Sequence, residues 1–198
     1  MNTLDVVHDF LRRQVKPGAV CIDRRRAGEG RDTALLCRLD GKNGRVIAFD
    51  IQEAAVEQTR ALLAEQGLTA EVVQDSHAHM ARYAAPGTVD CIVFNFGRLP
   101  GGDAKIFTTA ASSLPAIDAG LTLLRQGGVM ALALYYGKEN GYEEKNAILS
   151  RQSNEGGYRL TERLCGRRVC AYEIVRQRLG ESCDTENRRY IWKTGLIK

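Results

Sequence analysis

The stretch that decides the fold is residues 19–50, which read AVCIDRRRAGEGRDTALLCRLDGKNGRVIAFD. Two short apolar runs, Ala19–Asp23 and Arg45–Asp50, enclose a glycine-bearing loop and the helical pattern Thr33–Leu39. That pattern follows Asp32, a residue type favoured at helix N-caps. A strand, a crossover helix and a second strand form a βαβ unit, whose two strands are parallel.

The same alternation continues on both sides of this unit. Further apolar runs are Ala70–Gln74, Val89–Asn95 and Val129–Tyr135. Further helical patterns are Leu4–Val15, Glu53–Gln66, Leu114–Arg125, which Gly127–Gly128 would end, and Glu143–Arg151. Continuous apolar strands suit a parallel sheet that is covered on both faces. We therefore predict an α/β, Rossmann-like fold: a doubly wound, mostly parallel sheet with helices on both faces.

The length of 198 residues is enough for one α/β domain and too small for two ordinary ones. No linker, repeat or low-complexity tract marks a boundary. We predict a single domain over 1–198, with an N-terminal helix in 1–18, a cofactor-binding core in 19–157 and an atypical edge segment in 158–198. The strand candidates in the edge segment are Val169–Val175 and Tyr190–Lys193.

Composition restricts the compartment and the partners. The formal net charge of +4 is compatible with a nucleic-acid partner, although ordinary enzymes reach the same value. No stretch approaches the roughly 20 apolar residues of a membrane-spanning helix, and residues 1–15 lack the apolar core of a signal peptide. The six cysteines form no C-x-x-C pair and no cluster with histidine. We expect a cytoplasmic protein with free thiols, no metal site and no membrane partner.

Ligands of open α/β sheets bind at the carboxyl ends of the strands. After the first run, Gly28 and Gly30 would let the backbone approach a ligand, and the next helix would present free N–H groups. An ordinary turn is the alternative. The second run ends at Asp50, twenty residues after Gly30, where a carboxylate can accept both hydroxyl protons of a ribose. Together these features predict a nucleoside-bearing cofactor.

The type of cofactor follows from what the loop lacks. A dinucleotide fingerprint has a third glycine where this chain has Thr33. S-adenosylmethionine carries no pyrophosphate and does not need that third close contact. The segment Asp75–His77, after the third run, is well placed to hydrogen-bond an adenine edge. We therefore favour S-adenosylmethionine over NAD.

Two later strand ends carry candidate substrate residues. Asn95 ends the fourth run and could orient an attacking amine through its carbonyl oxygen, beside the tight loop 99–103. A sharp turn capped by Asp103 is the alternative. Tyr135 and Tyr136 end the fifth run and suit base stacking, with core or rim packing as the alternative.

Five segments in order along the chain resemble one family of class I methyltransferases. They are Gly28–Thr33 (GEGRDT), Ala48–Gln52 (AFDIQ), Asp75–His77 (DSH), Phe94–Asp103 (FNFGRLPGGD) and Tyr135–Gly137 (YYG). The family is the rRNA-methylase type whose members act as tRNA 5-aminomethyl-2-thiouridine methyltransferases in many Gram-positive bacteria. The resemblance implies S-adenosylmethionine as cofactor and a tRNA anticodon stem-loop as partner. It also implies methyl transfer to the exocyclic amine of the wobble nucleoside. A homodimer is compatible with the sequence.

The resemblance also implies which residues form the site. Those that would line the cofactor are Asp23, Gly28, Glu29, Gly30, Asp32, Thr33, Asp50, Ile51, Gln52, Asp75, Ser76, His77 and Asn95. Those that would face the nucleoside are Gly97, Arg98, Leu99, Pro100, Gly101, Gly102, Tyr135, Tyr136 and Gly137. As catalytic residues, Asn95 would hold the amine nitrogen in line and Asp103 would accept its proton.

The chain departs from the family pattern in two places. The first strand is usually followed by Asp-Ala-Thr-x-Gly, whereas residues 23–28 read DRRRAG, so that Arg24–Arg26 either lie near the sulfonium or turn outward. From about Leu164 onward, the family's closing strand pair is not matched. These departures motivate one competing hypothesis, a non-catalytic RNA-binding or interaction module with a methyltransferase fold. A second, a nucleotide-dependent oxidoreductase, is opposed by the missing third glycine and by the lack of a separate substrate domain.

Overall fold

A computed structural model of the chain describes residues 3–24, 30–97, 108–136, 139–150, 158–165, 169–176 and 190–191. Within these residues, the strands form one eight-stranded sheet with the order β3-β2-β1-β4-β5-β7-β6-β8. The strands are β1 Val20–Arg24, β2 Arg45–Asp50, β3 Glu71–Gln74, β4 Val89–Gly97, β5 Leu124–Tyr135, β6 Tyr158–Cys165, β7 Val169–Arg176 and β8 Tyr190–Ile191.

The pairings among β1 to β5 are parallel, and every pairing that involves β6, β7 or β8 is antiparallel. β1 pairs with β2 on one side and with β4 on the other, so the strand order reverses between β1 and β4. β5 then pairs antiparallel with β7, β7 with β6, and β6 with β8. The predicted doubly wound, mostly parallel sheet is confirmed, and its reversal point is where such folds bind ligands.

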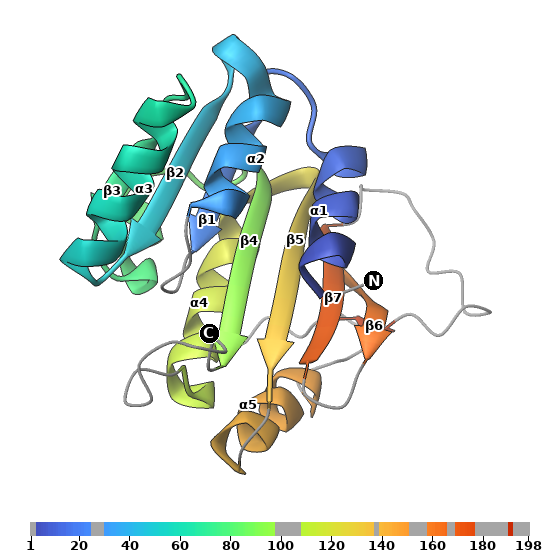
Figure 1. Ribbon diagram of the computed structural model, residues 1–198. Helices are drawn as coiled ribbons and strands as arrows, with labels where there is room; N and C mark the ends of the chain where they lie inside the picture. The colour runs from blue at the N-terminus through green and yellow to red at the C-terminus, as the bar shows by residue number, and fades with distance from the viewer. Residues whose placement is uncertain are drawn as a thin grey trace.

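Helices cover both faces of the sheet (Figure 1). The helices are α1 Thr3–Gln14, α2 Arg31–Asp40, α3 Glu53–Glu65, α4 Ala110–Leu123 and α5 Glu139–Ser150, with the short 3-10 helices η1 Gly41–Asn43 and η2 His77–Arg82. α1, α2 and α3 share one apolar layer with Cys91 and Val93 of β4. η2, α4 and α5 share the other with Ile92 and Phe94. Successive strand residues point to opposite faces, which explains why the buried strands are apolar throughout.

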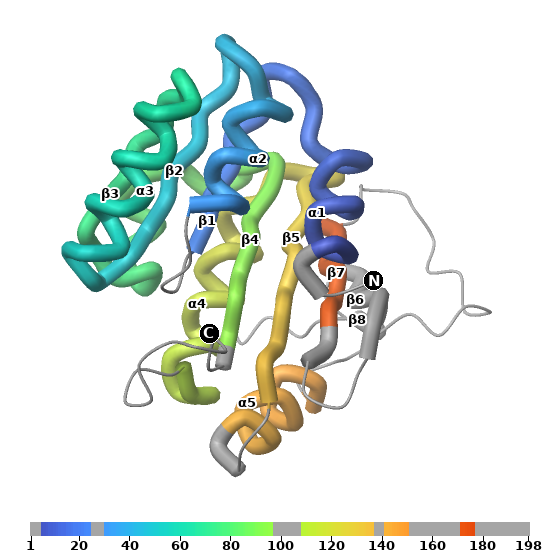
Figure 2. Tube along the Cα trace, in the orientation of Figure 1, coloured from blue at the N-terminus to red at the C-terminus, as the bar shows by residue number. Residues whose placement is uncertain are grey.

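The N-terminal helix packs on the far end of the chain. α1 contacts β5, β7 and β6, and the traces in Figures 1 and 2 show it lying beside β7. Val7, Phe10 and Leu11 of α1 are buried in the same apolar layer as Ala133 and Ala171. One helix from the start of the chain therefore covers the junction between the parallel and antiparallel parts of the sheet.

Several predicted boundaries needed correction. α4 begins at Ala110, four residues before the predicted Leu114, because Thr109 and Ser112 form a reciprocal capping box. The chain is already in β5 at Leu124, so the expectation that Gly127–Gly128 ends the helix was wrong. In the edge segment, Val169–Val175 is confirmed as a strand, Tyr190–Lys193 is a strand only over Tyr190–Ile191, and β6 was not predicted.

The described residues also show the state of three cysteines and allow a search for metal-ligand clusters and for membrane-spanning helices. Cys21, Cys37 and Cys91 are free and buried. No group of three or more potential metal ligands occurs among the described residues. Over the same part of the chain, no helix combines the length and the apolarity that a bilayer crossing requires.

Candidate functional site

The carboxyl ends of β1, β2, β4 and β5 bring most of the described candidate residues to one edge of the sheet. α2 begins beside this edge. Its N-cap residue, Gly30, has φ +70° and ψ +7°, and its carbonyl accepts a hydrogen bond from Ala34 N at 2.8 Å. A left-handed backbone disfavours any residue with a Cβ atom, so glycine suits the position where the loop turns into the helix.

Asp23, at the end of β1, faces the layer that contains α2. Its side chain is fully buried, and its Oδ2 accepts a hydrogen bond from Thr33 Oγ1 at 2.6 Å. This bond fixes the first turn of α2 to the end of the strand. Asp23 and Thr33 were both predicted to belong to the site, and the structure brings them into direct contact.

Arg24, the next residue, faces the opposite layer. It is only 7% exposed, donates from Nε to His77 Nδ1 at 3.2 Å and from Nη1 to the Asn95 carbonyl oxygen at 2.8 Å, and lies over the Phe96 ring. The first arginine of the triplet therefore turns inward and joins the end of β4 to the loop after β3. Its charge lies on the other face of the sheet from the Asp23 side chain. Arg25 and Arg26 are outside the described residues.

His77 is a neutral acceptor in this arrangement. Burial first, and the charge of Arg24 second, lower the pKa of His77 to about 4, against the smaller opposing effect of a hydrogen bond with the Ser112 backbone. At neutral pH, Nδ1 of His77 is therefore free of a proton and can accept the hydrogen bond from Arg24.

Asn95 is held by a chain of polar groups from two helices. Its Nδ2 donates to Asp32 Oδ2 at 3.1 Å, and the other oxygen of Asp32 lies 2.7 Å from His8 Nε2. The side chains of His8 and Asp32 are 16% and 12% exposed. Because a carboxylate only accepts hydrogen bonds, the Asn95 amide must turn its NH2 group toward Asp32. The side-chain oxygen of Asn95, Oδ1, then points away from Asp32.

The two tyrosines at the end of β5 lie on different faces. Tyr135 is half-buried in the layer of α1 and α2, and burial first, then the Asp32 charge, raises its pKa. Tyr136 is buried in the opposite layer, where its ring packs edge-on against Tyr142 and Lys145 Nζ lies 4.0 Å from the ring centroid. Tyr135 thus shares the side of the sheet with Asp32 and Asn95, whereas Tyr136 fills the core.

The ends of β2 and β3 complete the described part of the edge. Asp50 is buried and accepts a hydrogen bond from Gln52 N at 2.9 Å, while the side chain of the adjacent Ile51 is 60% exposed. Asp75 organises its own loop, because its carboxylate accepts from Ser76 N and Tyr83 Oη and contacts His79 Nδ1. Hydrogen bonding by His79 is the largest cause that lowers the pKa of Asp75.

The remaining predicted residues lie outside the described part of the chain. They are Gly28, Glu29, Arg98, Leu99, Pro100, Gly101, Gly102, Asp103 and Gly137. Conversely, the structure adds two residues that sequence reasoning did not assign to the site: His8, from the N-terminal helix, and Arg24 as a buried tie. No local spacing indicates His8, because its partner Asp32 is 24 residues away.

Comparisons with known proteins identify the family of the chain. The family model described as "Putative rRNA methylase" matches residues 46–155, which is more than half of the chain. Among curated proteins, the chloroplastic tRNA (mnm5s2U34)-methyltransferase of Arabidopsis thaliana is 29% identical over 155 residues, which cover 73% of this chain and 56% of the relative. The chain therefore spans little more than half the length of that relative.

Two solved structures are also similar. A "putative rRNA-methylase" from Clostridium thermocellum is 31% identical and superposes with a TM-score of 0.80, over 88% of this chain and 97% of the other. A "putative methyltransferase" from Streptococcus mutans, in complex with SAH, is 27% identical with a TM-score of 0.75, over 88% and 98%. The similarity extends over nearly the full length of both solved chains.

Proposed function

The chain belongs to the "Putative rRNA methylase" family, and from this premise we propose that it is an S-adenosylmethionine-dependent methyltransferase acting on tRNA. The substrate is the 5-aminomethyl group of the wobble uridine in the anticodon stem-loop. The name of the Arabidopsis relative supports this choice of nucleoside, and the SAH complex of the Streptococcus protein supports the cofactor. The resemblance found in the sequence led to the same family.

The described residues fit S-adenosylmethionine. Asp50 ends the second strand and is the carboxylate to accept the ribose hydroxyls, and the exposed side chain of Ile51 offers an apolar surface to the adenine. The left-handed Gly30 lets the backbone come close at the start of α2. Asp23 and Asp32 add negative charge near a cofactor whose sulfonium is cationic. When bound, S-adenosylmethionine supplies an electrophilic methyl group.

Asn95 carries the proposed chemistry on the substrate side. An aliphatic amine is largely protonated at neutral pH and must lose a proton before its lone pair can attack. With its NH2 group held by Asp32, Asn95 presents Oδ1 to a hydrogen of the amine and so keeps the lone pair aligned. Tyr135 lies on the same side of the sheet and offers its ring to the base. Asp103 is the proposed acceptor of the amine proton.

The observation that carries this proposal is the His8–Asp32–Asn95 chain at the reversal point of the strand order. It supports the proposal because an oriented amide is what the reaction needs beside the region where this fold binds a nucleoside cofactor. The inward position of Arg24 also bears on the non-catalytic hypothesis. The first arginine of the triplet is used to tie β1 to β4 and lies on the opposite face from Asp32.

The test is calorimetric titration of the full chain with S-adenosylmethionine and S-adenosylhomocysteine, followed by a methyl-transfer assay on tRNA carrying 5-aminomethyluridine. We expect micromolar binding of both ligands and methylation of the wobble nucleoside. Asp50→Asn should weaken ligand binding at least tenfold, about the effect of one lost charge-assisted hydrogen bond. Glu57→Gln, an exposed α3 residue with the same charge change, is the control.

The outcomes separate the competing functions. If neither ligand binds while tRNA does, the chain is a non-catalytic RNA-binding module, and the enzyme proposal fails. If both ligands bind and the tRNA is not methylated, the enzyme acts on another substrate, and the wobble-uridine proposal fails. Binding of NADH in place of S-adenosylhomocysteine would favour the oxidoreductase.

A further inference from the structure

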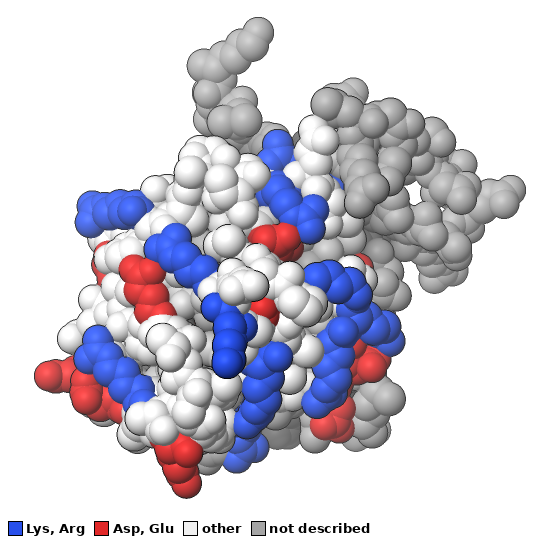
Figure 3. Space-filling view, turned by 90° about the horizontal axis from the view of Figure 1, so that it is seen from above, with Lys and Arg blue, Asp and Glu red and all other residues white. Residues whose placement is uncertain are grey.

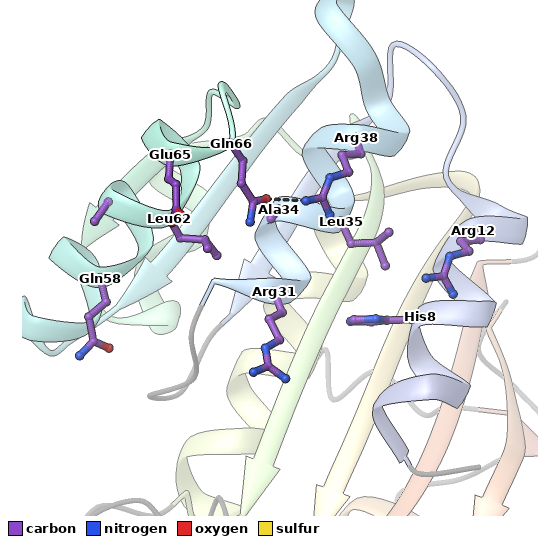
Figure 4. Close-up of a pocket in the computed structure, with 11 residues that line it drawn as sticks. His8, Arg12, Arg31, Ala34, Leu35, Arg38, Gln58, Leu62, Glu65 and Gln66 are labelled. Carbon is purple, nitrogen blue, oxygen red and sulfur yellow. Dashed lines mark hydrogen bonds between the residues drawn. The ribbon is translucent and has the colours of Figure 1, made fainter.

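A groove of about 770 Å³ crosses the helical layer formed by α1, α2 and α3. Its walls are the sides of these helices, and its apolar floor includes Ala34 and Leu35 of α2. Figure 4 shows His8 and Arg12 extending from α1 toward α2, and Arg38 reaching from α2 to Gln66 beyond the end of α3. Apart from His8, the residues that line this groove have no role in the proposed chemistry.

Positive charge dominates the lining of the groove. Arg12, Arg31 and Arg38 are exposed and line it, against a single carboxylate, Glu65. Arg31 and Arg38 are seven residues apart on α2, so they lie on one side of the helix at a separation of about 10 Å along its axis. The view from the end where the strands begin shows Lys and Arg side chains spread over that face, with Asp and Glu side chains among them (Figure 3). The groove therefore suits an extended anion with several charges.

The groove adjoins the candidate active site through His8. His8 lines the groove and hydrogen-bonds Asp32, which in turn binds Asn95. Arg31 lines the groove and directly precedes Asp32 in the first turn of α2. A chain that places a nucleoside next to Asn95 would thus leave the site past Arg31 and His8.

We propose that this groove binds the phosphodiester backbone of the RNA strand next to the target nucleoside. The inference rests on the proposed function. Guanidinium groups recognise phosphate oxygens with paired N–H donors, and three of them along a groove can contact several phosphates of an extended strand. The apolar floor accommodates the sugar and base edges between the charges. RNA is favoured over an acidic protein because His8, which lines the groove, also bonds Asp32 beside the proposed position of the nucleoside.

The experiment measures the affinity of a fluorescently labelled anticodon stem-loop, with 5-aminomethyluridine at the wobble position, for the full chain saturated with S-adenosylhomocysteine. The test variant is Arg12→Gln/Arg38→Gln. The matched control, Arg13→Gln/Lys42→Gln, removes the same charge from exposed cations that do not line the groove. We expect at least a tenfold loss of affinity in the groove variant and less than about twofold in the control. The slope of log K against log salt should fall by about 1.4 in the groove variant alone, about 0.7 per phosphate contact.

A gain-of-affinity variant guards against trivial misfolding. Glu65→Gln removes the carboxylate from the groove and should tighten stem-loop binding by about twofold or more, which an unfolded protein could not do. In methyl-transfer assays, the groove variant should raise KM for the RNA and leave kcat within about twofold.

Each contrary outcome has one meaning. Equal affinity losses in the two double variants, or unchanged binding by Glu65→Gln, would overturn the groove as an RNA site. If the groove variant Arg12→Gln/Arg38→Gln loses affinity for an acidic peptide that the parent chain binds, and its affinity for the stem-loop is unchanged, the groove would be assigned to a protein partner. Failure of the parent chain to bind S-adenosylhomocysteine would overturn the proposed function, which titration of the cofactor alone detects.

Discussion

The orientation of the Asn95 amide depends on His8, which contacts Asn95 only through Asp32. His8 donates to one oxygen of Asp32, and the other oxygen receives the NH2 group of Asn95. The His8 bond limits rotation of the carboxylate, because turning Asp32 would break both bonds together. In the proposed reaction, His8 is thus a positioning residue, which would act on the amine through Asp32 and Asn95.

Replacing His8 should therefore affect turnover more than binding. We expect His8→Ala to lower kcat for tRNA methylation on the order of tenfold, the scale of a small misalignment of reacting atoms. Affinity for S-adenosylhomocysteine should stay within about twofold, since α1 packs on β5, β7 and β6, whereas Asp50 ends β2. Steady-state kinetics with saturating cofactor provide the measurement.

The conservative variant distinguishes positioning from packing. His8→Gln keeps an N–H donor at similar reach and should retain most of kcat, although glutamine, like alanine, has no imidazole ring. Equal losses in both variants would mean that His8 only fills space between α1 and α2. No loss in either would remove it from the site altogether.

At the scale of elements, the start of β5 depends on one close approach. A Cβ atom added at Gly128 would lie 2.9 Å from the carbonyl oxygens of Arg125 and Val89. Both contacts are backbone atoms, which cannot move aside as a side-chain tip can. The register between β4 and β5 also shifts in this region, between Val89 and Cys91. Gly128 thus allows β5 to leave α4 and join β4 without a gap.

Gly128→Ala should accordingly destabilise the fold by about 2 kcal/mol, within the range for overpacking a tight site. Urea unfolding followed by circular dichroism measures the difference, and Gln126→Ala, an exposed residue in the same segment, is the control. A loss below about 0.5 kcal/mol in Gly128→Ala would show that the β4–β5 junction can relax.

The parallel part of the sheet was predictable because most of its strands contain a continuous apolar run and are followed by a helix. β6 was missed because Tyr158–Cys165 has no continuous apolar run, and its apolar–polar alternation breaks at the three consecutive polar residues 161–163. Its place is set by pairing with β7 and β8, which no local pattern records. The start of α4 was missed because the capping box at Thr109 precedes the apolar period of the helix.

The candidate site divides along similar lines. Asp50 and Asn95 were predictable because they lie at or near the carboxyl ends of apolar strands, and parallel strands bring those ends to one edge. The contact of His8 with Asp32 depends on the packing of α1 across β5 and β7. The contacts of Arg24 depend on the face of the sheet toward which its side chain points. Both are consequences of tertiary register, for which spacing in the sequence gives no rule.

At the scale of the whole molecule, two buried groups make opposite contributions to stability as the pH changes. The pKa of His77 is about 4 in the folded chain against 6.5 ordinarily, so the unfolded chain binds more protons between these values and stability rises with pH. Burial raises the pKa of Asp40 to about 6 from 3.8, so the folded chain binds more protons there and stability falls with pH. The windows overlap between about pH 4 and 6.

The two contributions can be separated by comparing the parent chain with His77→Gln. Lowering the pH from 7 to 5 costs the parent about 2 kcal/mol through His77, while protonation of Asp40 returns about 1 kcal/mol, so its net change should be small. His77→Gln keeps an acceptor for Arg24 and lacks the titration, so it should gain about 2 kcal/mol relative to the parent over the same interval. Urea unfolding at pH 5, 6 and 7 gives the two curves. Parallel curves would show that His77 is free to take up a proton in the folded chain, and that its bond from Arg24 does not hold it neutral.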